Sequence, residues 1–146
     1  MLRDLWSFQG RYRTLHLTWF AFFLSFVVWF NLAPLATTVK ADLGLTLGQI
    51  RTVAICNVAL TIPARVLIGM LLDKYGPRIT YSGILVFSAI PCLLFASAQD
   101  FNQLVISRLL LSIVGAGFVI GIRMVAEWFP PKEIGLAEGI YGGWGN

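Results

Sequence analysis

The chain has 146 residues, of which 58% are hydrophobic and 12% are charged, and its mean hydropathy is +0.78. A soluble domain carries about 25% charged residues, so this composition excludes an ordinary water-soluble fold. The net charge of +4 does not indicate nucleic acid, because the Lys and Arg residues are dispersed among predicted helix ends rather than gathered on one face.

Four apolar segments predict an all-α integral membrane protein. Each has the roughly 20 to 25 residues that cross a hydrocarbon layer about 30 Å thick. The segments cover residues 15–39, 47–72, 79–98 and 103–129. The first is too long for the apolar part of a signal peptide, so we interpret it as a retained helix. A fifth helix begins near Ile134, but residues 134–146 are too few to cross a bilayer. We therefore expect about four complete transmembrane helices plus the start of a fifth, in a chain that is a piece of a longer protein.

Short polar links separate these segments, so neighbouring helices are expected to be antiparallel. Thr46 followed by Gln49 predicts a capping box that opens the second helix. The basic residues gather on one side of the predicted topology, which places the N-terminus in the cytoplasm by the positive-inside rule. That side holds Arg3, Arg11, Arg13, Lys74, Arg78, Arg123 and Lys132, and the other side holds Lys40, Arg51 and Arg108.

Arg65 is the candidate substrate-binding residue that the pattern indicates most directly. It precedes Asp73 by eight residues, or about 12 Å of helix, which places it near the middle of the bilayer. An arginine there costs about 2.5 to 3.5 kcal/mol on insertion scales. Snorkelling and a structural ion pair are the alternatives, although the first four segments carry no acidic residue at mid-depth. A guanidinium without a carboxylate favours a small planar anion such as nitrate or a carboxylate.

Other polar and small residues follow this arginine along the second predicted helix. At intervals of four residues, they form a stripe that suits a face lining a cavity: Asn57, Thr61, Arg65, Gly69 and Asp73.

Arg108 and Arg123 in the fourth segment lie near opposite edges of the bilayer, where snorkelling is the expected explanation for both. Glu127 can pair with Arg123 or with Arg78, which suggests a gate. The spacing from Gly117 to Gly121 predicts close helix packing.

Residues 69–78, GMLLDKYGPR, resemble the signature of the major facilitator superfamily between helices two and three. Gly69, Asp73, Gly76 and Arg78 match this signature. Pro77 departs from it, and Ser112 stands where the helix-four motif usually has glycine.

Within that superfamily the chain is similar to the nitrate/nitrite porter family. The resemblance rests on FQGRYR (residues 8–13), FNLAPL (30–35), Arg65 before the signature turn, and GGWGN (142–146). It implies that Arg65 binds nitrate, that Phe118 is the aromatic residue beside the anion, and that Asn146 is the signature asparagine.

The resemblance also implies the architecture of the complete carrier. Residues 1–146 would form part of an N-terminal six-helix half that ends within helix five. The C-terminal half would supply a second arginine, and the two halves would rock around a midplane site in the cell's inner (plasma) membrane.

Two rival interpretations remain open. The chain could belong to a carrier of another small anion, such as an organic acid, or be a non-transporting truncated membrane fragment. The sequence contains no pairing of nucleophile and base, no cofactor loop and no metal-ligand cluster, so we expect neither enzyme activity, nor a cofactor, nor a metal.

Overall fold

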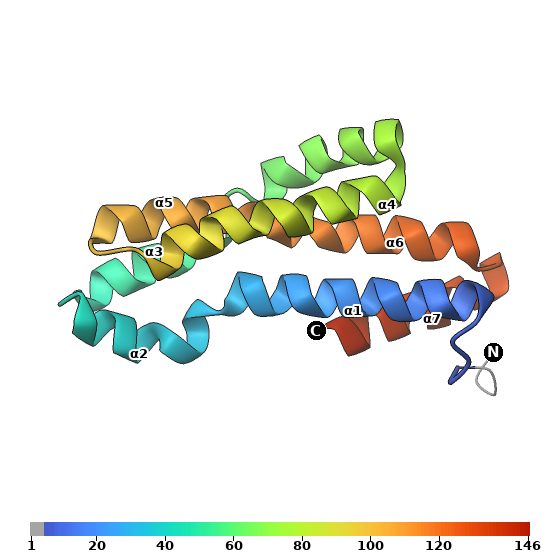
Figure 1. The fold of residues 1–146 in the computed structure, drawn as a ribbon, viewed down its shortest axis with the longest axis horizontal. Helices are drawn as coiled ribbons and strands as arrows, with labels where there is room; N and C mark the ends of the chain where they lie inside the picture. The colour runs from blue at the N-terminus through green and yellow to red at the C-terminus, as the bar shows by residue number, and fades with distance from the viewer. Residues whose placement is uncertain (1–4) are drawn as a thin grey trace.

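The computed structural model describes residues 5–146, which consist of helices and their connections (Figure 1). The prediction of an all-α protein is confirmed. The helices are α1 (Gly10–Phe30), α2 (Leu32–Asp42), α3 (Leu47–Ala59), α4 (Thr61–Ala96), α5 (Phe101–Ser112), the 3-10 helix η2 (Ile113–Ala116), α6 (Gly117–Trp128) and α7 (Pro131–Gly145). Arg3, one of the basic residues behind the predicted topology, lies outside the described residues.

Three continuous helical stretches of the described chain are long and apolar enough to cross a membrane: Gly10–Asp42, Leu47–Ala96 and Phe101–Trp128. The middle stretch reverses direction at Gly76, as the green to yellow-green ribbon of α4 shows (Figure 1). Gly76 has φ 77° and ψ 167°, a backbone conformation that is open to glycine but not to other residues. The first limb of α4 (residues 61–75) and its second limb (residues 77–96) therefore belong to the second and third predicted segments.

Three of the four predicted segments contain a local interruption of the α-helix, which the apolar pattern did not indicate. The first segment divides at Asn31 between α1 and α2, and the second divides at Leu60 between α3 and α4. The fourth contains the 3-10 turn of η2. Hydropathy detects how long an apolar run is, but not where side chains of another helix replace the backbone hydrogen bonds within it.

The helix ends at the turns follow the local sequence. Thr46 and Gln49 form the predicted capping box, in which the Gln49 amide donates to Thr46 Oγ1 at 3.2 Å and the Thr46 amide donates to Gln49 Oε1 at 2.8 Å. Asp100 caps α5 by accepting a hydrogen bond of 2.8 Å from the Gln103 amide. The capping-box prediction is confirmed.

The turns alternate between the two ends of the molecule. The start of α1, the turn at Gly76 and the α6–α7 link lie at one end, whereas the α2–α3 and α4–α5 turns lie at the other (Figure 1). Arg11 forms a salt bridge of 2.7 Å with Glu133, and the rings of Tyr12 and Phe129 meet edge to face at 6.0 Å. These contacts join the start of α1 to the α6–α7 link and to the first turn of α7.

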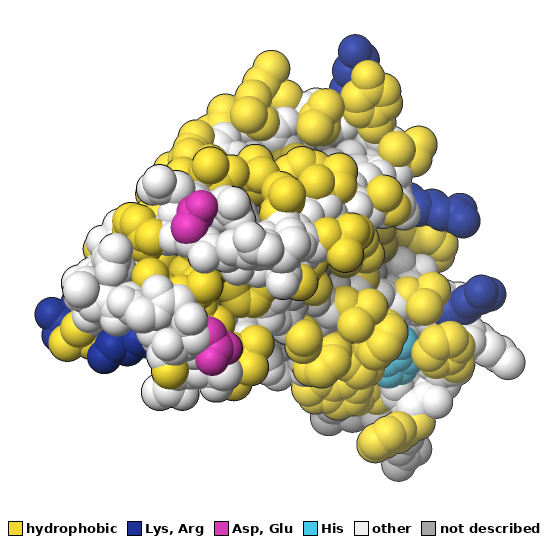
Figure 2. Space-filling model, turned by 60° about the vertical axis from the view of Figure 1, so that its left-hand side comes forward, with side chains coloured by type: hydrophobic (Ala, Val, Ile, Leu, Met, Phe, Trp, Pro, Cys, Tyr) yellow, Lys and Arg dark blue, Asp and Glu magenta, His cyan; other side chains and the backbone are white. Residues whose placement is uncertain are grey.

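The outer surface is largely apolar. Hydrophobic side chains cover much of the face in Figure 2, and Lys and Arg side chains lie toward its margins. Large apolar residues that are strongly exposed include Ile62, Val86 and Leu93. Such a surface suits contact with lipid rather than with water.

Close packing between helices depends on glycines of the fourth span. A Cβ added at Gly117 would lie 3.3 Å from the Tyr81 ring, and one at Gly121 would overlap the Tyr141 ring. At Gly115 an added Cβ would lie 2.6 Å from the Trp29 indole. The close helix contact predicted from Gly117 and Gly121 is confirmed.

Candidate functional site

Arg65 lies on the first limb of α4, one turn after Thr61, and its side chain is exposed. Within residues 5–146 the Arg65 guanidinium makes no ion pair or hydrogen bond with another side chain. The five donors of this group are therefore available to a partner outside the described chain.

The predicted polar stripe along the second span is divided by the break at Leu60. Asn57 and Thr61 are buried at 7% and 6% exposure, whereas Arg65 and Asp73 are exposed. The two buried members contact α5, so they hold helices together rather than line an open cavity. The pattern located the polar residues correctly but could not reveal the interruption between them.

Phe118 lies in an aromatic cluster built by α1, α6 and α7. Its ring centroid is 5.4 Å from that of Phe22 and 5.8 Å from that of Tyr141. The Tyr141 hydroxyl donates a hydrogen bond of 3.2 Å to the Phe118 carbonyl oxygen. Gly145 packs against Phe22, which brings the exposed Asn146 to the edge of the same cluster.

Arg65 does not join this cluster within the chain. Figure 1 shows the first limb of α4 and the C-terminal end of α7 on opposite sides of the bundle. Of the three candidate substrate-binding residues, the structure therefore brings Phe118 and Asn146 into one region and leaves Arg65 in another.

The residues of the signature turn have different structural roles. Gly76 permits the reversal, and Pro77 starts the second limb, where its missing N–H has no helical partner to lose. Gly69 lies in the first limb with no atom near its added Cβ, while Asp73 and Arg78 are exposed at the turn. The departure from the family signature at Pro77 thus fits the start of a helix.

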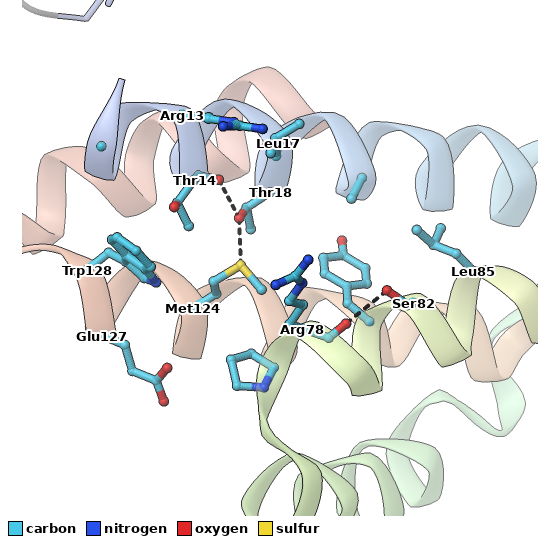
Figure 3. Close-up of a pocket in the computed structure, with 14 residues that line it drawn as sticks. Arg13, Thr14, Leu17, Thr18, Arg78, Ser82, Leu85, Met124, Glu127 and Trp128 are labelled. Carbon is cyan, nitrogen blue, oxygen red and sulfur yellow. Dashed lines mark hydrogen bonds between the residues drawn. The ribbon is translucent and has the colours of Figure 1, made fainter. Parts of the chain in front are cut away.

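A groove of about 790 Å³ runs between α1, the second limb of α4 and α6 (Figure 3). Arg13, Arg78 and Glu127 bring charges to its wall from these three elements. Thr18 Oγ1 donates to Met124 Sδ at 2.9 Å and so joins α1 to α6 beside the groove. The groove lies toward the end of the bundle that holds the start of α1 and the signature turn.

Glu127 pairs with Arg123, one of its two predicted partners. The Arg123 Nε–H donates to Glu127 Oε1 at 2.8 Å. Both side chains are strongly exposed, at 56% and 42%, so solvent screens their attraction and the pair is weak. Such a weak pair can exchange partners at little cost.

Arg108 corrects the sequence interpretation, because its side chain does not snorkel. The residue is 0% exposed, and Arg108 Nη2 donates to Asn31 Oδ1 at 2.5 Å. A second, longer bond of 3.4 Å joins Nη1 to Asn57 Oδ1, and the guanidinium carbon lies 3.8 Å from the centroid of the Phe95 ring. The helix interruption at Asn31 supplies an acceptor that Arg108's position in the sequence could not indicate.

No group of three or more His, Cys, Asp or Glu residues within residues 5–146 could hold a metal ion.

The long apolar helices define a multi-pass helical membrane protein. Residues 18–146 match the Major Facilitator Superfamily, and the chain belongs to this superfamily. The sequence prediction of this superfamily is confirmed.

Its relatives include carriers of nitrogen oxyanions. The chain is 71% identical to the nitrate/nitrite transporter NrtP of Picosynechococcus sp. and 70% identical to the NrtP of Nostoc punctiforme, over all 146 residues in each case. It is 34% identical over 135 residues, or 90% of its length, to the probable nitrate/nitrite antiporter NarK1 of Thermus thermophilus. These alignments cover 27%, 29% and 30% of the respective relatives, so the chain spans less than a third of their length. The resemblance to nitrate/nitrite porters is confirmed, and no solved structure matches the chain.

Proposed function

We propose that the chain is part of a carrier that moves nitrate or nitrite across the membrane by alternating access. The observation that carries the proposal is the identity of 70% or more to two nitrate/nitrite transporters along every residue of the chain. The unpartnered guanidinium of Arg65 adds a chemical reason, because a planar fork of N–H donors matches a planar oxyanion.

Residue roles follow from this proposal. Arg65 binds the anion, and Phe118 and Asn146 contribute once the halves of the carrier close around it. Glu127 exchanges between Arg123 and Arg78 as a gate beside the signature residues Gly69, Asp73 and Gly76. The weak, exposed pairing of Glu127 with Arg123 supports this part of the proposal.

The location and the partners belong to the same proposal. The carrier spans the inner (plasma) membrane with its N-terminus in the cytoplasm, where Arg11, Arg13 and Lys74 gather. Residues 1–146 contribute to an N-terminal six-helix half, and a C-terminal half supplies the opposing residues of the site.

Competition between anions tests the function. The full-length carrier is reconstituted in proteoliposomes, and initial uptake of labelled nitrate is measured against excess nitrite, formate, acetate or chloride. Saturable nitrate uptake that nitrite suppresses more strongly than the carboxylates supports the proposal. Preferential suppression by a carboxylate would reassign the cargo to an organic acid, and the absence of saturable uptake would reject transport of nitrate.

A further inference from the structure

The break at Leu60 leaves a backbone amide outside the helical ladder, in the middle of a stretch that is long and apolar enough to cross a membrane. Leu60 has φ −90° and ψ 1°, and its own side chain cannot cap α4. An unpaired N–H is costly where no water can reach it. Ser112 of α5 removes this cost, since its Oγ accepts a hydrogen bond of 3.1 Å from the Leu60 amide.

A second hydrogen bond crosses the same junction, again with Ser112 as the acceptor. Thr61 Oγ1 donates to the Ser112 carbonyl oxygen at 2.9 Å, and the two residues are 6% and 0% exposed. One residue of α5 thus accepts from both residues at the start of α4. The cap of α4 comes from a helix about fifty positions further along the chain.

Arg108 holds the other side of the break. It lies one turn before Ser112 on α5 and reaches Asn57 in the last turn of α3 at 3.4 Å. Consequently α5 holds the end of α3 through Arg108 and the start of α4 through Ser112. The angle between these two helices depends on α5.

We propose that Ser112 is a positioning residue for Arg65. Arg65 follows Thr61 by one turn, so the direction in which α4 leaves the break decides where the Arg65 guanidinium lies. The inference rests on the proposed nitrate function of Arg65. Ser112 stands where the superfamily motif usually has glycine, which has no hydroxyl, so the cap is a feature of this chain rather than of the motif.

The test compares two buried serines of α5 in the full-length carrier. Ser112→Ala removes the acceptor of the Leu60 amide. Ser107→Ala is the matched control, because Ser107 is also 0% exposed but its hydroxyl bonds only Leu104 of its own helix, at 2.8 Å. Initial nitrate uptake is measured over a range of concentrations and normalised to carrier abundance, and the thermal midpoint is recorded for each variant.

Ser112→Ala is expected to raise the nitrate KM by about three- to ten-fold, the effect of one net hydrogen bond, while Ser107→Ala leaves it within about two-fold. Ser112→Cys, whose sulfur is a weaker acceptor, should give an intermediate KM. A residue that only stabilises the fold would lower abundance or the thermal midpoint and leave KM unchanged. That result, or equal effects of Ser112→Ala and Ser107→Ala, would overturn the inference.

A second variant keeps the test decisive if Ser112→Ala does not accumulate. Thr61→Val preserves shape and removes only the donor to the Ser112 carbonyl. Unchanged nitrate KM values in both Thr61→Val and Ser112→Cys would then overturn the inference. Failure of the proposed function is recognised separately, because the unmodified carrier itself would show no saturable nitrate uptake.

Discussion

Arg108 Nη2 donates a hydrogen bond of 2.5 Å to Asn31 Oδ1 across 77 positions of sequence. The bond joins α5 to the junction of α1 and α2. The Arg108 side chain is fully buried there. A buried guanidinium is tolerated only when acceptors surround it. Asn31 and Asn57 accept from Nη2 and Nη1, whereas the buried Nε–H has no partner within residues 5–146. The asparagines in two apolar segments thus stabilise the bundle through one arginine.

Asn31→Ala should destabilise the carrier, because it leaves a buried charged donor without its closest acceptor. The expected loss is about 1 to 3 kcal/mol in the free energy of unfolding. Thermal unfolding of the purified carrier in detergent measures it. Asn102→Ala is the control, since Asn102 is exposed at the start of α5 and its replacement should change stability by less than about 0.5 kcal/mol. Equal effects of the two substitutions would contradict the bridging role of Asn31.

Gly76→Ala should weaken the hairpin of α4, because φ 77° with ψ 167° strains any residue that has a Cβ. The expected cost is about 1 to 3 kcal/mol. Gly83→Ala in the second limb is the matched control, because no atom lies within 4 Å of its added Cβ and its backbone is helical. The thermal midpoint should fall for Gly76→Ala and stay or rise for Gly83→Ala. The reverse order would show that the reversal does not depend on glycine.

Gly121→Ala should separate α6 from α7, because the new methyl group would overlap the Tyr141 ring. Overpacking of this kind costs about 1 to 3 kcal/mol. Gly139→Ala in α7 meets no atom within 4 Å and serves as the comparison. Thermal unfolding of both variants is the measurement. A midpoint for Gly121→Ala that matches Gly139→Ala would mean that the two helices do not pack at this contact.

The topology is tested by labelling single cysteines in a background with Cys56→Ser and Cys92→Ser. Gln9→Cys and Lys74→Cys place exposed thiols at one end of the bundle, and Gln99→Cys places one at the other. An impermeant maleimide added to intact cells should label Gln99→Cys, and label the other two only after the membrane is opened. Labelling of Gln9→Cys and Lys74→Cys from outside, without Gln99→Cys, would invert the orientation.

Much of the fold could be predicted from the sequence because its signals are local. The length of the apolar runs predicted the membrane-spanning segments. Thr46 and Gln49 predicted a helix start, and the polar residues around Gly76 predicted a turn. The junction around Arg108 could not be predicted, since its partners Asn31 and Asn57 are 77 and 51 positions away.

The candidate site also contains one residue with a local sequence signal and one without. Arg65 could be predicted as a binding residue because a cation in an apolar run is a local anomaly, and its role stays a prediction. Ser112 was missed as a cap because its target, the Leu60 amide, carries no side-chain signal. The only available hint was a serine at a position where the family motif usually has glycine.

If the Arg65 guanidinium recognises a planar anion, Arg65→Lys should impair nitrate transport by the carrier. Lysine keeps the positive charge and has a similar cost in the membrane, but it replaces a flat fork of donors with a point charge. Arg51→Lys is the matched control, because Arg51 is an exposed arginine in α3 of the same predicted span. Initial nitrate uptake by the full-length carrier, normalised to its abundance in the membrane, should be largely abolished by Arg65→Lys and nearly unchanged by Arg51→Lys. Near-normal uptake by the Arg65→Lys carrier would contradict guanidinium recognition and leave Arg65 with a structural role.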